Sequence, residues 1–344
     1  MVELLRELSN LNGVSGHENA VRNYIIAAVE PYSDSVRVDN MGNVIAFKKG
    51  RTGAKTKLIA AHTDEIGLII SGITDDGYLK FKAVGEVDTR HIIAKCVRID
   101  SGIEGVGVVN GVLGMKAIHL QKREEREKTA DISSLYIDIG AKNRKQAEKR
   151  VKLGDYAAFA TEFEDAGGRV WGKALESRIG CACLIELMEN DYDDDVYFAF
   201  TSQREVGMRG AYTAAYGLDI DEALVLEGTE SADMYGAKPE ETAAKLGGGV
   251  CVEFIDRYAI PDRRLTSELY NALKDAKIAA QEKKSARGLT DAGAFQRCAG
   301  GIKTACAAVP VRYAGTPACM AAKSDIEAMK QAAQLFVEGY GEKN

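Results

Sequence analysis

A histidine and an aspartate follow an apolar run early in the chain, with the spacing of a metal ligand and its hydrogen-bond partner. His62 comes directly after 58–61, a run that predicts a buried strand, and Asp64 lies two residues further on. An imidazole at a strand end can bind a divalent cation while the carboxylate accepts its second N–H. A surface turn that contains a histidine fits the same pattern, so both interpretations stay open at this point.

Three glutamates occupy comparable positions, at the ends of predicted strands or at the start of a predicted helix. In an open α/β sheet, the carboxyl ends of the strands gather side chains from separate segments at one edge. Each glutamate alone is more simply explained as a solvated carboxylate. Together with His62 they form a predicted divalent-cation site, because one imidazole and several carboxylates suit such a cation. The three are Glu176, Glu205 and Glu227.

The stretch 196–211, VYFAFTSQREVGMRGA, joins a buried strand to an unexpected pair of charges. The apolar residues 196–201 predict the strand, and a polar turn then places Arg204 next to Glu205 before a predicted helix. At such a place we expect two acids, one to hold a metal and one to move protons. Arg204 cannot replace the second acid, because a guanidinium with a pKa above about 12 does not accept a proton from water.

Alternating predicted helices and strands surround a segment of a different kind. Residues 74–161 are rich in glycine and in short alternating strands, which predicts a small β domain of barrel or sandwich type. The flanking residues, 1–73 and 162–344, have the helix–strand alternation of an α/β domain. We therefore expect one discontinuous α/β domain, interrupted by an inserted β domain.

A short polar pattern predicts how the second helix begins. Ser15 is followed three residues later by Glu18, which is the spacing of a capping box, and a helical pattern then continues to about Val29. The helix is therefore expected to open at Ser15.

The composition excludes several classes of protein. With 46% hydrophobic and 28% charged residues, the 344-residue chain is expected to be a soluble globular protein. A net charge of -6 argues against nucleic acid or an anionic membrane as a partner, and no apolar run has the roughly 20 residues of a membrane helix. Seven cysteines without regular spacing favour a reducing, cytoplasmic location over a disulfide framework.

Several segments, in order along almost the whole chain, resemble the glutamyl-aminopeptidase and tetrahedral-aminopeptidase family. This is a family of cytoplasmic di-metal exopeptidases, some of which were once labelled cellulases. The segments of the α/β parts are AAHTDEIGLII (60–70), GKALESRIGC (172–181), TSQREVGMRGA (201–211), LTDAGA (289–294) and VPVRYAGTP (309–317). Two further segments, KAIHL (116–120) and DIGAKN (138–143), are similar to the family's inserted domain.

The resemblance implies a fold class and an assembly. The fold would be α/β, a mixed-sheet metallo-aminopeptidase domain of the phosphorylase/hydrolase-like type, with an inserted small PDZ-like β-barrel domain. That inserted domain serves oligomerisation in the family, which implies a dimer-based homo-oligomer of up to a dodecamer. The implied cofactors are two zinc or cobalt ions per chain, and the implied substrates are short peptides.

The resemblance also assigns a role to each candidate ligand. His62 matches a ligand of the first metal, and Asp64 matches the residue that orients it. Glu176 stands in place of the aspartate that bridges both metals, and Glu227 in place of an aspartate ligand of the first. Glu205 matches a ligand of the second metal.

Two departures from the family pattern bear on catalysis. Arg204 stands where the family has the glutamate that acts as general base, and Gly315 stands where it has a histidine ligand of the second metal. The longer side chains of Glu176 and Glu227 can also shift a ligand atom by about 1 Å. The sequence therefore predicts an impaired or inactive aminopeptidase that binds one metal ion or none.

Alternatives remain for both the function and the arginine. The chain could be a non-catalytic binding or structural subunit that assembles with an active paralogue, or a still-active aminopeptidase with a single metal. We expect Arg204 to substitute electrostatically for at least one metal among the three glutamates. In the alternative, Arg204 turns to solvent while one metal binds at His62 and Glu227.

Overall fold

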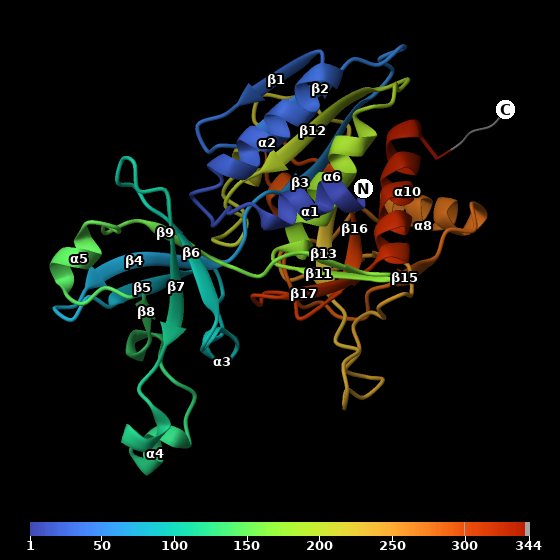
Figure 1. Ribbon diagram of the computed structural model, residues 1–344. Helices are drawn as coiled ribbons and strands as arrows, with labels where there is room; N and C mark the ends of the chain where they lie inside the picture. The colour runs from blue at the N-terminus through green and yellow to red at the C-terminus, as the bar shows by residue number, and fades with distance from the viewer. Residues whose placement is uncertain (299, 341–344) are drawn as a thin grey trace.

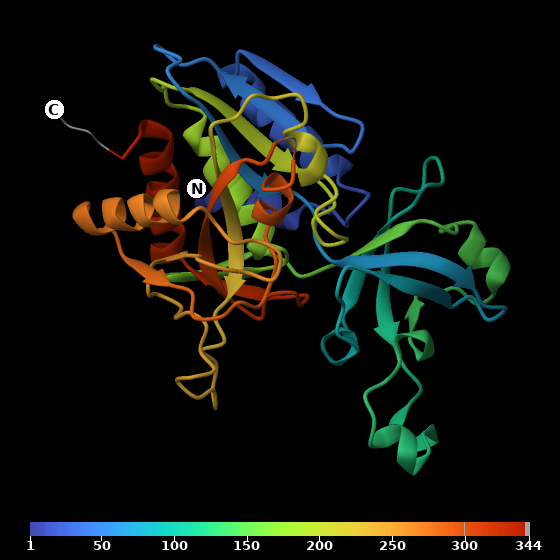
Figure 2. The same ribbon diagram turned by 180° about the vertical axis from the view of Figure 1, so that it is seen from behind.

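The computed structural model describes residues 1–298 and 300–340. A larger α/β body carries a smaller β barrel at one side, and both views of the molecule show the two parts joined by extended segments (Figures 1 and 2). The expected α/β architecture with an inserted barrel is confirmed. Among the described residues, no helix combines the length and the apolar character that a bilayer crossing requires.

Four parallel strands form the centre of an 11-stranded mixed sheet. They are almost wholly apolar because helices cover both of their faces, which is typical of parallel sheets. Their order across the sheet is β12, β3, β13 and β16. Their bounds are β3 Thr56–His62, β12 Asp195–Thr201, β13 Glu222–Glu230 and β16 Lys303–Arg312.

Shorter strands extend the sheet on both sides. The first hairpin continues it antiparallel beyond β12, and three more antiparallel strands continue it beyond β16. A parallel pair, β14 and β15, attaches to β16 off the main path. The bounds are β1 Ser35–Val38, β2 Val44–Lys48, β10 Glu164–Ala166, β11 Arg169–Gly172, β14 Val250–Val252, β15 Ala280–Glu282 and β17 Cys319–Ala322.

The period of two along β3 sends alternate side chains to opposite faces of the sheet. Ile59 and Ala61 join a large core with five helices, whereas Leu58 and Ala60 join a smaller core with two short helices. The first five helices are α1 Val2–Asn10, α2 Asn19–Val29, α6 Leu175–Leu187, α8 Arg263–Asp275 and α10 Lys323–Glu338. The two short ones are α7 Ala211–Ala214 and α9 Ala292–Phe295.

Six antiparallel strands close the barrel in the order β4-β5-β8-β7-β6-β9. Its first strand, Gly67–Ile73, precedes the expected domain boundary at residue 74, so the barrel begins earlier than the glycine pattern suggested. The hairpin that carries α4 projects from the barrel away from the α/β body (Figure 1). The other elements between 79 and 159 are β5 Leu79–Val84, α3 Thr89–Ile92, β6 Cys96–Asp100, β7 Val108–Gly114, α4 Arg123–Arg126, β8 Tyr136–Asp138, α5 Arg144–Glu148 and β9 Tyr156–Phe159. Short 3-10 turns occur at Glu30–Tyr32, Ile118–Leu120 and Ile132–Ser134.

The prediction for the start of the second helix was wrong. Helix α2 begins at Asn19, and Glu18 is its N-cap residue without a side-chain cap. Ser15 donates its hydroxyl to Asp64 instead, and the Glu18 carboxylate accepts from the backbone N–H of Gly16 at 2.8 Å. A tertiary partner for Ser15 has thus displaced the local capping pattern.

Candidate active site

The carboxyl ends of the parallel strands bring the predicted site residues to one edge of the sheet. Thr201, the last residue of β12, pairs with His62, the last residue of β3, and β13 continues beside them to Glu227. A cavity of about 380 Å³ opens at this edge. Its lining includes four of the positions singled out in the sequence, Glu176, Arg204, Glu205 and Gly315.

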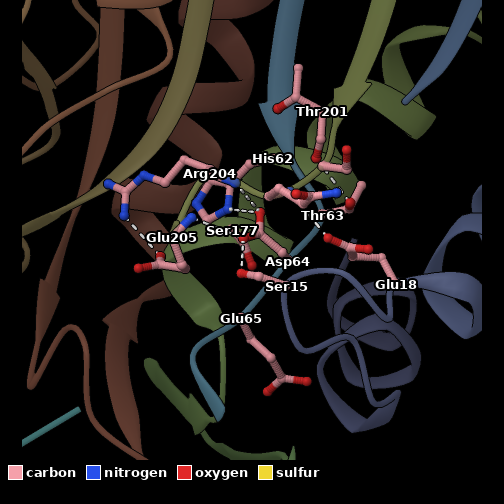
Figure 3. A network of polar contacts seen from close by, with 12 residues as sticks. Ser15, Glu18, His62, Thr63, Asp64, Glu65, Ser177, Thr201, Arg204 and Glu205 are labelled. Atoms are coloured by element: carbon pink, nitrogen blue, oxygen red, sulfur yellow. Dashed lines mark hydrogen bonds and ion pairs between the residues drawn. The ribbon is translucent and has the colours of Figure 1, made fainter. Parts of the chain in front are cut away.

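His62 lies fully buried between two carboxylates. Its Nδ1 is 3.2 Å from Oδ1 of Asp64 (Figure 3). Its Nε2 is 3.3 Å from Oε2 of Glu227. Burial disfavours the charged imidazolium, but the negative charge of Glu227 and the hydrogen bond to Asp64 outweigh it. Together they raise the pKa of His62 to about 10. Without a metal, His62 is therefore a cation at neutral pH.

Asp64 holds more than the imidazole. Its two oxygens accept the backbone N–H groups of Arg204 and Glu205, each at 2.9 Å, and the hydroxyl of Ser15 (Figure 3). Burial disfavours the carboxylate, but the hydrogen bonds and the charge of His62 prevail and lower the pKa of Asp64 to about 2. Asp64 thus fixes the turn after β12 as well as the ring of His62.

The side chain of Arg204 points into the site. Its Nη1 donates to Oε1 of Glu205 at 2.8 Å, and its Nη2 donates to the carbonyl of Leu289 at 2.6 Å. The same Nη2 lies 3.6 Å from Oε2 of Glu227. The side chain is only 14% exposed, so these are largely desolvated charges. Although burial opposes it, the charge of Arg204, with that of His62, lowers the pKa of Glu227.

Glu176 stands apart from this cluster and has donors of its own. Its Oε1 accepts the backbone N–H of Gly315 at 3.3 Å, and its Oε2 accepts the thiol of Cys319 at 3.0 Å. Burial and the charge of Glu176 raise the pKa of Cys319 well above its usual range, which keeps the thiol protonated as a donor. Both carboxylate oxygens that would face metal ions therefore already have protein partners.

Asp291 is a buried acid at the site that was not among the predicted site residues. Its backbone N–H lies 3.4 Å from Oε1 of Glu227, and its carboxylate accepts the hydroxyl of Thr201. Burial and the charge of Glu227 raise the pKa of Asp291 to about 7. Its place in the segment LTDAGA was the only signal in the sequence.

The geometry tests whether these residues suit a metal centre. Across residues 1–298 and 300–340, no group of three or more His, Cys, Asp or Glu side chains is arranged to hold a metal ion. Among the buried atoms of the described site that have no hydrogen-bond partner are Nε2 of His62 and Oε2 of Glu227, which lie 3.3 Å apart, and Oδ1 of Asp291. Catalytic zinc sites have three protein ligands. The arrangement does not fit a two-metal centre, and for a single metal it supplies two donors.

The match to known proteins covers both sequence and fold. Residues 42–331 match the family of M42 glutamyl aminopeptidases. A putative aminopeptidase of Acetivibrio thermocellus is 36% identical over 340 residues, 98% of each chain. The crystal structure of a TET aminopeptidase from a Thaumarchaeota archaeon superposes with a TM-score of 0.93 at 32% identity, covering 98% of this chain and 95% of that one.

A second similar structure is the TET1 peptidase of Pyrococcus horikoshii, which can assemble into a tetrahedron or a large octahedral shell. It has a TM-score of 0.87 and 29% identity, and the match covers 98% of this chain and 99% of that one. The chain described here belongs to the M42 glutamyl aminopeptidase family, a family of metallopeptidases.

Proposed function

We propose that this chain is an M42-family protein that binds short peptides in its cavity and hydrolyses them very slowly or not at all. The observation that carries the proposal is the position of Arg204. Its guanidinium lies 2.8 Å from Glu205 and 3.6 Å from Glu227, which is where a cation would neutralise these carboxylates. The arrangement supports an arginine that substitutes for a metal ion.

The chemistry of the general base gives independent support. Arg204 cannot accept a proton from a water molecule, and the charges of Glu227 and Glu205 raise the pKa of Arg204 further despite its burial. Loss of a general base lowers a hydrolytic rate by about 10²–10⁴. Gly315 has no side chain to supply a ligand, and its N–H is directed at Glu176 instead.

A specific observation favours a second candidate, an aminopeptidase with a single zinc or cobalt ion. His62 Nε2 and Glu227 Oε2 are buried and lack hydrogen-bond partners, so they would anchor one ion. A bound metal would polarise a peptide carbonyl and activate water. A metal ion binds only the neutral imidazole. His62 would therefore have to lose a proton, although Glu227 and Asp64 stabilise the protonated ring. For this reason we expect that the chain binds no metal ion rather than one.

The assembly and the location are part of the same proposal. We expect a dimer-based homo-oligomer, up to a dodecamer, formed through the inserted barrel, because the TET1 peptidase with the same fold assembles into large shells. We expect the chain to act in the cytoplasm, alone or beside an active paralogue. The seven cysteines of the chain, which have no regular spacing, accord with a reducing compartment.

A restoration experiment tests the assignment of the site. The paired change Arg204→Glu and Gly315→His returns the family's base and ligand. A Cβ added at Gly315 would have no neighbouring atom within 4 Å, although the φ of 69° costs a non-glycine residue about 1–2 kcal/mol. The double variant should bind zinc or cobalt and gain at least a hundredfold in peptidase activity over the parent chain. Efficient hydrolysis by the parent chain would contradict the proposal.

A further inference from the structure

A buried ion pair lies in the wall of the same cavity, outside the residues discussed so far. Strands β14 and β15 run parallel, with Val252 opposite Glu282. Glu253 and Lys283 directly follow the last residues of these two strands, and both line the cavity. Because the strand ladder fixes both backbones, the two side chains are held side by side on a rigid element.

The ion pair is incompletely satisfied. Nζ of Lys283 lies 3.0 Å from Oε1 of Glu253, and the side chains are 5% and 2% exposed. Oε2 of Glu253 has no hydrogen-bond partner among the described residues. A buried carboxylate oxygen without a donor is costly, so a ligand that supplies a donor at this place would gain binding energy.

We propose that Glu253 and Lys283 recognise the side-chain carboxamide of asparagine or glutamine in a bound peptide. This inference rests on the proposed function, since it names the peptides that the cavity takes. The amide NH2 of the ligand donates to the open Oε2 of Glu253. The amide carbonyl accepts from Lys283, whose ammonium has three donors and gives one of them to Glu253.

Other side chains fit this pair less well. A ligand carboxylate would pair with Lys283 but would be repelled by Glu253. A ligand ammonium would pair with Glu253 but would be repelled by Lys283. An apolar side chain would leave Oε2 of Glu253 buried without a donor. A hydrogen bond to a charged group is typically strong enough for about tenfold to a hundredfold discrimination. Of these four kinds of end group, only the carboxamide complements both partners without adding charge.

Calorimetric titration of the full-length chain with four dipeptides tests the proposal. The dipeptides are Gln-Ala, Glu-Ala, Lys-Ala and Met-Ala, which differ in the end group of a side chain of similar length. Gln-Ala should bind at least tenfold more tightly than each of the others. Equal affinity for Gln-Ala and Met-Ala would overturn the inference while leaving peptide binding intact.

Two variants make the test independent of the wild-type ranking. Glu253→Gln leaves Lys283 without its carboxylate and should shift the preference to Glu-Ala. Lys283→Met leaves Glu253 without its ammonium and should shift the preference to Lys-Ala. Lys284→Met changes the exposed neighbour and should keep the preference for Gln-Ala. Thermal melting of each variant checks that the chain is folded.

The outcomes separate this inference from the function on which it rests. If none of the four dipeptides binds, the proposed peptide-binding function fails and the inference fails with it. If the dipeptides are hydrolysed, only the proposal of lost activity fails, and KM values then replace affinities in the same ranking. If both charge variants keep the wild-type ranking, the pair does not select the ligand and the inference alone is wrong.

Discussion

At the scale of single residues, the site is a set of carboxylates that the protein itself has neutralised. Glu205 and Glu227 share the guanidinium of Arg204, and Glu176 accepts from Gly315 and from a cysteine thiol. In a metal centre, metal cations would neutralise these carboxylates. Here the donors belong to the chain itself, so we expect that the folded state does not need a metal ion to compensate these charges.

Removal of the charge of Arg204 should make the stability of the fold depend on a bound metal ion. In Arg204→Met, Glu205 loses its cation in a desolvated site and Glu227 keeps only His62, and breaking such a buried pair typically costs about 3–5 kcal/mol. We expect a lower free energy of unfolding in denaturant titrations, and partial recovery when zinc is added. Arg209→Met, an exposed position in the same loop, should change neither quantity. Equal stability of the two variants would show that Arg204 does not neutralise the cluster.

The charge of His62 predicts a pH dependence. The pKa of His62 is raised from 6.5 to about 10, so its stabilising contribution is fully present below about pH 6.5 and is lost as the pH rises towards 10. The free energy of unfolding should therefore fall across this window, and His62→Gln should remove that fall. NMR of carbon-13-labelled histidine can follow the ring directly, because the chain has only four histidines. Titration of His62 near pH 6.5 would contradict the charged state.

Some of these residues could be found in the sequence and others could not. Arg204 and Gly315 were visible because they replace residues of a known pattern at known positions. Cys319 and Ser15 were not, because the contacts of Cys319 with Glu176 and of Ser15 with Asp64 join distant parts of the chain. For Ser15, the capping-box spacing with Glu18 suggested a local role, and the tertiary contact with Asp64 overrides it.

At the scale of elements, helix α6 and strand β13 place Glu176 by direct backbone contact. A Cβ on Gly228 would overlap the Cα of Glu176, so the helix can approach the strand only where no side chain intervenes. Gly180 has the same role one turn later, where a Cβ would lie 2.7 Å from the Cβ of Ala61. The position of the first turn of α6 therefore depends on Gly228 in the neighbouring strand β13.

This packing gives a prediction with a matched control. Gly228→Ala should destabilise the fold by about 1–3 kcal/mol, the usual cost of overpacking, and should displace Glu176 from its donors. Gly168→Ala has open space around the added methyl group and should leave stability within about 0.5 kcal/mol. Thermal melting of both variants measures the difference. Similar melting temperatures would mean that the helix shifts freely and does not fix Glu176.

The elements themselves were largely predictable. Apolar runs such as 58–61 and 196–201 predicted the central strands, because parallel strands are covered on both faces. The limit of the barrel was not predictable, since β4 at Gly67–Ile73 has the same apolar character as a strand of the main sheet. Only its pairing with β5 and β9 assigns it to the barrel.

At the scale of the whole molecule, the barrel also reaches the site. A Cβ on Gly85, which follows β5, would lie 3.2 Å from the Cβ of Glu205, and its neighbour Glu86 lines the cavity. The barrel is therefore part of the cavity wall as well as the proposed surface for assembly. If copies of the chain contact one another at the barrel, such contacts could alter the position of Gly85 and Glu86 beside the cavity.

The proposed assembly is a prediction for the intact chain. Light scattering coupled to size-exclusion chromatography should give a mass of several chains, because the TET1 peptidase with this fold forms large shells. The mass should be unchanged by chelators if the assembly, as proposed for the site, does not need a metal ion. A monomer at micromolar concentration would exclude the homo-oligomer.

The most direct test of the central claim is the metal content per chain. Protein expressed with zinc and cobalt supplied, and freed of excess metal, should contain close to zero ions per chain by elemental analysis, because Arg204 already neutralises Glu205 and Glu227. The variant with Arg204→Glu and Gly315→His, treated in the same way, should contain metal. Two ions per parent chain would contradict the claim that the arginine has replaced the metal.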